Sequence, residues 1–396
     1  MFEKVQAAPA DPILGLTDAY KSDTRANKVN LGVGVYKDSD GATPILATVK
    51  KAEALLVEKE ISKTYLSIEG TPAYNQAVQK LLFGADSPII ANDRARTAQA
   101  PGGTGALRIA AEFMVRQLGI KRIWVSNPTW ANHGNIFTSA GLEVVQYAWY
   151  DADTKGLDFD GLQKDLANLA EGDAVLLHGC CHNPTGIDPT LEQWQAIANL
   201  VKASKALPLF DFAYQGFATG IDEDAASVRL FADQFDELLV ANSFSKNFGL
   251  YNERAGAVTL VANDAATASQ AFSQVKSIIR GIYSNPPSHG ALVVATILED
   301  EALTKQWQAE VAGMRVRIKE MRDAFVAGLA AKGVQQDFGF ISEQNGMFSF
   351  SGLTPEQVAK LKDEFAIYIV GSGRISVAGI TPHNIEHLID AVAAVL

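Results

Sequence analysis

The sequence predicts an α/β protein with a mostly parallel sheet in a larger domain and an α+β arrangement in a smaller one. Three observations support this prediction. The chain has 396 residues, which is more than one ordinary hydrophobic core accommodates. Short apolar runs alternate with helical segments through its middle, and the order of elements changes in the last third. With 47% hydrophobic and 20% charged residues, the composition is typical of globular proteins and argues against disorder or a fibrous repeat.

Five short apolar runs in the middle of the chain have the composition of buried strands. They are Ile123–Ser126, Val144–Trp149, Ala174–His178, Leu207–Phe210 and Leu238–Asn242. A segment able to form a helix separates each run from the next. This alternation favours a mostly parallel sheet with both faces covered by helices.

The last third begins with one apolar stripe at steps of three and four residues, which predicts a long helix packed on the core. Its members are Leu303, Trp307, Val311, Met314, Ile318, Met321, Phe325 and Leu329. Beyond it we expect a strand at Met347–Phe350, a helix at Pro355–Phe365, a strand at Ile367–Val370 and a helix at Asn384–Val395. This mixed pattern predicts the smaller domain.

Charge and cysteine content argue against several classes of partner. The formal net charge is -11 and no Lys/Arg-rich tract occurs, so neither nucleic acid nor an anionic membrane surface is an expected partner. No leader-like start is seen, and no apolar run approaches the roughly 18 residues of a membrane span, so we expect a cytoplasmic protein. The adjacent Cys180 and Cys181 fall short of a metal site even with His178 and His182 nearby, so we expect reduced thiols and no metal.

Polar residues follow several of the predicted strands. Asn127, Asn183, Asp211, and Ser243 with Lys246 all lie at or shortly after the carboxyl end of a run. In open α/β sheets ligands bind beyond these ends, so we expect the side chains to share one crevice. A buried aspartate there needs a cationic or hydrogen-bonding partner, and a protonated pyridine nitrogen would serve. The alternative for the Asp211 segment is a surface turn.

Two further segments could hold a phosphate. The loop from Ser243 to Arg254 brings hydroxyls and a guanidinium next to Lys246, whose amine could attack a carbonyl. The glycine-rich stretch Pro101–Leu107 leads into a helical pattern and could present backbone N–H groups to a phosphate. Taken alone, the first could be a solvated loop and the second a structural helix cap. The second lacks the G-x-G-x-x-G spacing and follows no convincing strand, which argues against a dinucleotide fold.

Taken together, these segments resemble the aspartate aminotransferases, a pyridoxal-phosphate family whose other branches include aromatic amino-acid aminotransferases. The resemblance runs from Asn30–Tyr36 to Gly373–Arg374, and His182–Gly186 with Ser243–Arg254 is its most specific combination. It implies a fold-type I transferase in which residues 45–315 form the large domain with a mostly parallel seven-stranded sheet. Residues 1–44 and 316–396 would form the small α+β domain, which closes over the substrate.

The resemblance also implies roles around pyridoxal 5′-phosphate. Lys246 would hold the cofactor covalently and, once freed, move the proton between the substrate Cα and C4′ of the cofactor. Asp211 would keep the pyridine nitrogen protonated, and Tyr214 and Asn183 would hydrogen-bond the phenolic oxygen. Trp130 would stack over the ring. Both Trp130 and Asn183 would also contact the substrate.

The cofactor phosphate would have ligands from both subunits of a homodimer. Gly103, Thr104, Ser243 and Arg254 would bind it from one subunit. Tyr65 would reach it from the neighbouring subunit. The active sites would therefore be shared.

The substrate carboxylates would be held by two arginines. Arg374 would grip the α-carboxylate with a bidentate fork that a lysine cannot supply. Arg280 would read the side-chain carboxylate across the dimer interface, and Gly34 would close over the substrate. The implied reaction exchanges the amino group of L-aspartate with 2-oxoglutarate in a ping-pong cycle that yields oxaloacetate and L-glutamate.

Three alternatives to this reaction remain open at this point. The first is an aromatic amino-acid aminotransferase. The second is a lyase or decarboxylase of the same pyridoxal-phosphate fold. The third is a binding protein that uses the crevice without chemistry, because a fold never proves an activity.

Overall fold

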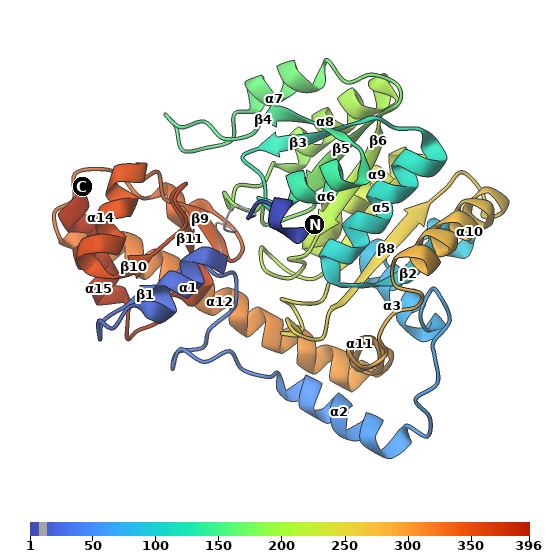
Figure 1. Ribbon diagram of the computed structural model, residues 1–396, viewed down its shortest axis with the longest axis horizontal. Coiled ribbons are helices and arrows are strands. Elements are labelled where there is room, and N and C mark those ends of the chain that lie inside the picture. Colours follow the sequence, from blue (N-terminus) through green and yellow to red (C-terminus); the bar gives the residue numbers. More distant parts are fainter. Residues whose placement is uncertain (8–13) are drawn as a thin grey trace. The chain divides into compact units, whose positions relative to one another are not determined.

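A seven-stranded sheet organises the larger part of the computed structural model, which describes residues 1–7 and 14–396 (Figure 1). The strand order is β2-β8-β7-β6-β5-β3-β4, and only β8 runs antiparallel to its neighbours. The strands are β2 Ala95–Pro101, β3 Arg122–Asn127, β4 Glu143–Ala148, β5 Asp173–His178, β6 Leu207–Phe212, β7 Leu238–Ser243 and β8 Ala255–Val261. The predicted α/β class with a mostly parallel seven-stranded sheet is therefore confirmed.

Helices cover both faces of this sheet, so its central strands are buried on both sides. Alternate residues of a strand point to opposite faces. Leu209 of β6 belongs to the core under α5, α6 and α10. Phe210 contacts Trp194 of α8 and Phe231 of α9 on the other face, with ring centroids 6.2 and 5.1 Å apart. The helices of this part are α2 Ala47–Lys59, α3 Pro72–Phe83, α4 Pro88–Ala91, α5 Gly102–Leu118, α6 Asn132–Ala140, α7 Phe159–Leu166, α8 Leu191–Ser204, α9 Ala226–Gln234, α10 Ala265–Ile282 and α11 His289–Glu299, with a 3-10 turn η2 at Glu223–Ala225.

All five strands that the sequence predicted in the middle of the chain are present, with ends shifted by one or two residues. Our interpretation of the glycine-rich stretch was wrong in one respect, because it does follow a strand: β2 ends at Pro101, directly before Gly102. The strand was not recognised because its sequence, ARTAQAP, has no run of large or β-branched apolar residues. Its buried Ala98 and Ala100 instead pack in the core beside α5.

The chain divides into two compact units, one of residues 44–183 and 187–316 and one of residues 1–43, 184–186 and 317–396. The second unit contains two small sheets, in which β1 pairs parallel with β10 and β9 antiparallel with β11. Its elements are η1 Phe2–Lys4, α1 Leu14–Ser22, β1 Val29–Asn30, α13 Phe340–Glu343, β9 Phe348–Phe350, α14 Pro355–Phe365, β10 Ile367–Tyr368, β11 Arg374–Ser376, η3 Val377–Gly379 and α15 Ile385–Val395. The unit boundary at 316/317 falls within α12, Glu301–Ala331.

The long helix and the C-terminal elements also match the sequence prediction. All members of the predicted stripe on α12 are buried except Met321, which is partly buried. The helix predicted at Pro355–Phe365 is observed with those bounds. In the described parts of the chain, no helix is long and apolar enough to cross a membrane.

Candidate active site

The carboxyl ends of β6 and β7 bring four of the predicted residues together. Asp211 is the penultimate residue of β6, and Lys246 follows three residues after the end of β7. The Lys246 ammonium lies 4.8 Å from the centroid of the Tyr214 ring. Asn183 Nδ2 donates to the Tyr214 hydroxyl over 3.4 Å. An amine, a carboxylate, a phenol and an amide thus meet at one edge of the sheet.

Lys246 has an amine that is easier to deprotonate than an ordinary lysine amine. Burial lowers the pKa of Lys246 to about 8, with the Asp211 carboxylate opposing the shift and the Arg254 guanidinium adding to it. A neutral amine is the nucleophilic form, so this environment favours attack on a carbonyl carbon. Perturbed amines of this kind concentrate at functional sites.

Asp211 keeps its negative charge although it lies in the interior. Burial raises its pKa, but the hydrogen bond from His133 and the electrostatic effects of His133 and Lys246 outweigh burial and hold the pKa below its ordinary value. His133 Nε2 lies 2.9 Å from Asp211 Oδ2. The carboxylate is therefore ionised at neutral pH and suited to a cationic partner such as a pyridinium nitrogen.

A chain of hydrogen bonds extends behind Asp211. His133 Nδ1 lies 2.8 Å from the Thr129 hydroxyl, which lies 3.0 Å from His178 Nε2. Burial, aided by the charge of His133 and opposed by Asp211, lowers the pKa of His178 to about 3, so His178 is neutral. Sequence analysis missed Thr129 and His133 and treated His178 only as a metal candidate. The position of His178 at the end of a predicted strand was a usable signal.

A cradle for an anion is formed where β2 meets α5. The first turn of this 17-residue helix is Gly102, Gly103 and Thr104. A Cβ on Gly102, whose φ is +74°, would lie 2.4 Å from Arg254 Nη2, and a Cβ on Gly103 would lie 3.2 Å from the Ser243 Cβ. The guanidinium and a hydroxyl-bearing residue therefore approach the helix N-terminus closely, where backbone N–H groups and the helix dipole favour phosphate.

Gly256 supports this cradle and was not identified from the sequence. A Cβ at this position in β8 would lie 2.5 Å from the carbonyl carbon of Gly102 and 2.8 Å from the Asn242 oxygen. Only a residue without a side chain allows the backbone of the cradle to approach β8 so closely.

Trp130 lies at the entry to α6, next to His133. The two rings meet edge to face with centroids 5.2 Å apart. Because His133 is bonded to Asp211, the indole lies close to the group around Lys246, and it remains partly exposed.

Tyr65 and Arg280 lie together but in a different place. Both line a pocket of about 760 Å³ with Ser284 and Pro287, and none of the residues around Lys246 lines it. The Arg280 guanidinium donates to the Ser284 hydroxyl. Tyr65 is 92% exposed. Within one chain, then, these two residues are gathered with each other and not with Lys246.

Arg374 and Gly34 belong to the smaller unit, where they share one aromatic neighbour. The buried Arg374 donates to the Gly32 carbonyl over 2.5 Å, and its guanidinium lies 4.3 Å from the centroid of the Phe348 ring. A Cβ on Gly34 would fall 2.4 Å from Phe348 Cζ. Phe348 was predicted only as part of a strand, and its contact with two candidate residues was not foreseen.

Cys180 and Cys181 are buried and reduced, as predicted. Their sulfur atoms lie within 4.8 Å of an Asp224 carboxylate oxygen. That carboxylate already accepts four backbone N–H groups, from Gly216, Ala218, Thr219 and Gly220. Four hydrogen bonds fill the lone pairs that a metal ion would need.

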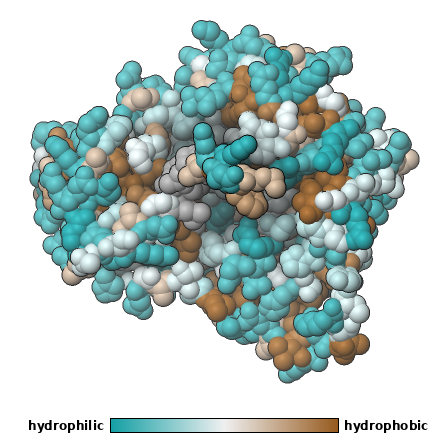
Figure 2. Space-filling view, viewed as in Figure 1, coloured by the Kyte–Doolittle hydropathy of each residue, from teal (hydrophilic) through white to brown (hydrophobic). Residues whose placement is uncertain are grey.

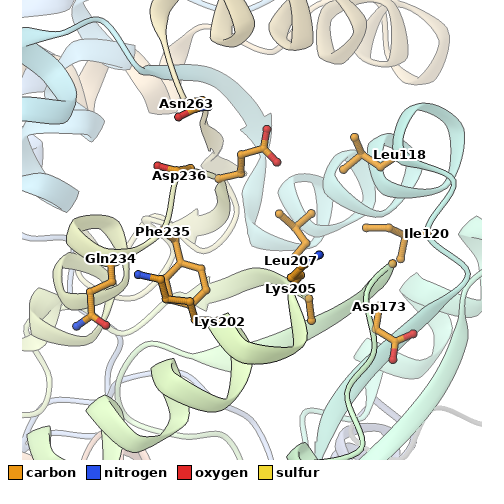
Figure 3. A pocket seen from close by; sticks show the side chains of 13 residues that line it. Leu118, Ile120, Asp173, Lys202, Lys205, Leu207, Gln234, Phe235, Asp236 and Asn263 are labelled. Carbon is orange, nitrogen blue, oxygen red and sulfur yellow. The ribbon is translucent and has the colours of Figure 1, made fainter.

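A surface pocket of about 580 Å³ lies at the opposite, amino-terminal edge of the sheet (Figure 3). Leu207 and Phe235 lie at its centre, with Asp236 and Asn263 on one side and Leu118 on the other. No candidate residue lines it. Because ligands of open α/β sheets bind at the carboxyl ends, the group around Lys246 is the better candidate.

Comparison with known proteins gives consistent matches over the full length of the chain. The family model for aminotransferase class I and II matches residues 26–392. The chain is 60% identical to an aspartate aminotransferase of Haemophilus influenzae and 59% identical to one of Salmonella typhi, each over 396 residues and 100% of both chains. It superposes with a TM-score of 0.98 on the aromatic-amino-acid aminotransferase of Burkholderia pseudomallei covalently bound to pyridoxal phosphate, at 48% identity, covering 100% of this chain and 99% of that one.

Proposed function

The chain belongs to the aminotransferase class I and II family, and from this premise we propose that it transfers the amino group between L-aspartate and 2-oxoglutarate. The products are oxaloacetate and L-glutamate. The observation that carries the proposal is the placement of a Lys246 amine of lowered pKa beside Asp211 and Tyr214. The enzyme is a transaminase that depends on pyridoxal 5′-phosphate.

The residues at the strand ends fit this cofactor. When bound, pyridoxal 5′-phosphate supplies an aldehyde that joins an amine and a ring that takes up the electron pair left on the substrate Cα. The phosphate fits the cradle of Gly103, Thr104, Ser243 and Arg254, which is positive and lies at a helix N-terminus. The ionised Asp211 suits the protonated ring nitrogen.

The side chains around the ring divide the work of holding it and moving the proton. Asp211 holds the proton on the pyridine nitrogen, and His133 keeps the carboxylate ionised and oriented. Tyr214 and Asn183, already in contact with each other, bond the phenolic oxygen. Trp130 would stack on the ring. Lys246 would remove the Cα proton and return it at C4′, because its amine is neutral in an appreciable fraction near pH 8.

Substrate selection rests on two arginines. Arg374 binds the α-carboxylate as a bidentate fork, held in place by the Gly32 carbonyl and the Phe348 ring. Gly34 leaves room beside that ring, and Trp130 and Asn183 complete the substrate contacts. Arg280 binds the second carboxylate. Its alternative role is a cation at the end of α10, which stabilises a helix by only about 0.3–1 kcal/mol.

We also propose a homodimer with shared sites. Tyr65 and Arg280 line one pocket that none of the residues around Lys246 lines, as expected if the two residues serve the site of the partner. Val57 and Ile61, which precede Tyr65 in the sequence, are 80% and 98% exposed. Figure 2 shows hydrophobic surface over the end of α2, where such residues would be covered in a dimer. We propose further that the protein is cytoplasmic. We also propose that residues 1–44 and 316–396 form a small domain that closes over the substrate.

Aromatic amino-acid transamination is the second candidate, because a solved structure similar to this chain carries that name. We would measure kcat/KM for aspartate, phenylalanine and alanine in the wild type and in Arg280→Asp. Loss of a charge partner in a closed site costs several kcal/mol, so aspartate should exceed alanine by orders of magnitude in the wild type. Charge reversal should abolish that preference and spare alanine. An aspartate-to-alanine ratio that Arg280→Asp leaves unchanged would return Arg280 to its helix-end role.

A further inference from the structure

Gln99 is a buried polar residue with no place in the proposed chemistry. It lies in β2, three residues before the cradle glycine Gly102, and is 0% exposed. Its Oε1 has no hydrogen-bond partner among the described residues, although burial of an unpaired amide oxygen is costly. A residue retained at such cost in the interior calls for an explanation.

The hydrogen bonds of Gln99 join two segments that are distant in sequence. Its backbone N–H donates to the Glu69 carbonyl over 2.9 Å. Its side-chain Nε2 donates to the Pro287 carbonyl over 2.5 Å, and its own carbonyl accepts from the Tyr283 hydroxyl over 3.1 Å. One residue therefore ties the segment after Tyr65 to the segment after Arg280.

The Glu69 side of this bridge fits tightly. Gly70 has a φ of +87°, and a Cβ there would lie 2.7 Å from both the Cβ and Oε1 of Gln99. Ser67 donates to the Gly70 carbonyl over 2.5 Å, and Asn75 Nδ2 donates to the Glu69 carbonyl over 3.0 Å. The chain that follows Tyr65 is thus fixed against the Gln99 side chain.

The Pro287 side fixes the chain that leaves α10. The helix ends at Ile282, two residues after Arg280. Tyr283 and Pro287, at the two ends of a five-residue segment, both bond Gln99. Ser284, which lies between them, accepts from Arg280. The exposed Arg280 has its orientation limited by this segment.

We propose that Gln99 is a positioning residue that sets the placement of Tyr65 and Arg280, and through Arg280 the preference for dicarboxylate substrates. The inference rests on the proposed function. Gln99 lies in β2, the strand that leads into the phosphate cradle. In this proposal β2 supports the cradle of its own subunit and also positions Tyr65 and Arg280, which serve the site of the partner. A displacement of about 1 Å in a substrate-positioning group can cost about a hundredfold in rate.

The test compares Gln99→Met with Thr97→Val in the holoenzyme. Met keeps the length of the side chain and removes both the Nε2 donor and the unpaired Oε1. Thr97 is the matched control, since it is buried in the same strand and its hydroxyl bonds Thr259 and Gln79 and neither segment. In Gln99→Met the ratio of kcat/KM for aspartate to that for alanine should fall about tenfold, equivalent to about 1.4 kcal/mol, and in Thr97→Val it should not change.

A double-mutant cycle separates positioning from general damage. In the Arg280→Ala background, Gln99→Met should cause no further loss of the aspartate-to-alanine ratio, because the two residues act as one unit. Tyr283→Phe, which removes the hydrogen bond to the Gln99 carbonyl, should lower the ratio in the same direction and serves if Gln99→Met does not fold. Because the Gln99 side chain also packs against Gly70 in the segment after Tyr65, Gln99→Met should also weaken the binding of pyridoxal phosphate to the apoenzyme.

The outcomes distinguish this inference from the proposed function. If the wild type prefers aspartate and folded Gln99→Met or Tyr283→Phe keeps the same ratio, the inference is overturned and the proposed function stands. Equal losses on aspartate and alanine would likewise overturn it, because they indicate only a structural role. A wild type without any preference for aspartate overturns the proposed function and this inference with it.

Discussion

Three effects set the pKa of the Lys246 amine. Burial lowers it to about 8 from the ordinary 10.5, Asp211 opposes this, and Arg254 adds to it. Between these two values the unfolded chain binds more protons at this lysine than the folded chain does. The free energy of unfolding of the apoprotein therefore rises with pH across that window as far as Lys246 contributes, and the penalty is present in full below about pH 8. The burial that makes the Lys246 amine reactive therefore also lowers the stability of the apoprotein at neutral pH.

Because Asp211 and Arg254 have opposite effects on the pKa of Lys246, we predict that replacing them shifts this pKa in opposite directions. In the apoprotein, acetylation of Lys246 by limiting acetic anhydride should titrate with a midpoint near pH 8. Asp211→Asn should move the midpoint down, because the carboxylate that stabilises the ammonium is lost. Arg254→Gln should move it up, because a repelling charge is lost. Mass spectrometry of the Lys246 peptide against an internal amine standard reads the midpoint. An unchanged midpoint in both variants would show that burial alone controls the amine, and shifts of both in one direction would contradict the opposing roles of the two neighbours.

The sequence predicted the residues at this scale unevenly. Asp211, Ser243 and Lys246 were found because each lies at or just after the end of an apolar run, where a local rule applies. His133 was not found, since it meets Asp211 across 78 positions of sequence and lies on a helix with no signal of its own. Patterns in a single sequence can identify polar residues that follow a strand. They do not identify residues of another helix or strand that contact those residues in the fold.

At the scale of elements, the β2–α5 junction depends on close approach of backbones. Gly102 adopts a left-handed φ of +74° and is approached by Arg254 on one side and Gly256 on the other. β2 was missed because alanine and polar residues form it, whereas β3 to β7 were found from their apolar runs. The small side chains of β2 made it hard to recognise as a strand in the sequence. The same small side chains let α5 pack closely against β2 and leave room for the cradle.

We predict that Gly256→Ala damages the cradle. The added methyl would meet the Gly102 backbone at 2.5 Å, so the turn must move, at a cost of about 1–3 kcal/mol in stability. Binding of inorganic phosphate to the apoprotein, measured by calorimetry, should weaken about tenfold, since the N–H groups and Arg254 lose their common focus.

Gly134→Ala is the matched control for that experiment. Gly134 lies in α6, where an added methyl group would meet none of the described side chains within 4 Å. Its replacement should stabilise the helix by about 0.5–1 kcal/mol and leave the phosphate affinity unchanged. Phosphate affinity of wild-type strength in Gly256→Ala would contradict the account of the cradle.

At the scale of the whole molecule, the chain has a net charge of -11, and yet arginine side chains lie at the positions proposed to bind phosphate and carboxylate groups. Three arginines with different surroundings are involved: Arg254, Arg280 and Arg374. Their assignment to one substrate and one cofactor came from the resemblance of the chain to a known family. Composition could exclude nucleic acid as an expected partner, but it could not show which segments meet across subunits. The exposed Tyr65 and the pocket it shares with Arg280 make that question testable.

Shared sites predict complementation between two impaired variants. Lys246→Ala lacks the amine, so its homodimer should be inactive. Arg280→Ala lacks the dicarboxylate partner, so its homodimer should keep only a small residual activity on aspartate. A mixed dimer contains one site with both residues intact, and random exchange should restore about a quarter of wild-type activity if sites act independently. Subunit exchange is verified by native mass spectrometry. Confirmed exchange without any recovery would place both residues in the same chain's site.

The central claim is that this protein is a transaminase that uses Lys246 on aspartate, and a half-reaction tests it most directly. Holoenzyme is mixed with L-aspartate alone, without any 2-oxo acid, and the released products are quantified per active site. The account predicts one equivalent of oxaloacetate per site and then no further reaction. After the aspartate has been removed, 2-oxoglutarate should yield one equivalent of L-glutamate per site. Lys246→Ala should release none on this timescale. Continuous turnover of aspartate alone, with release of carbon dioxide or ammonia in place of oxaloacetate, would contradict the account.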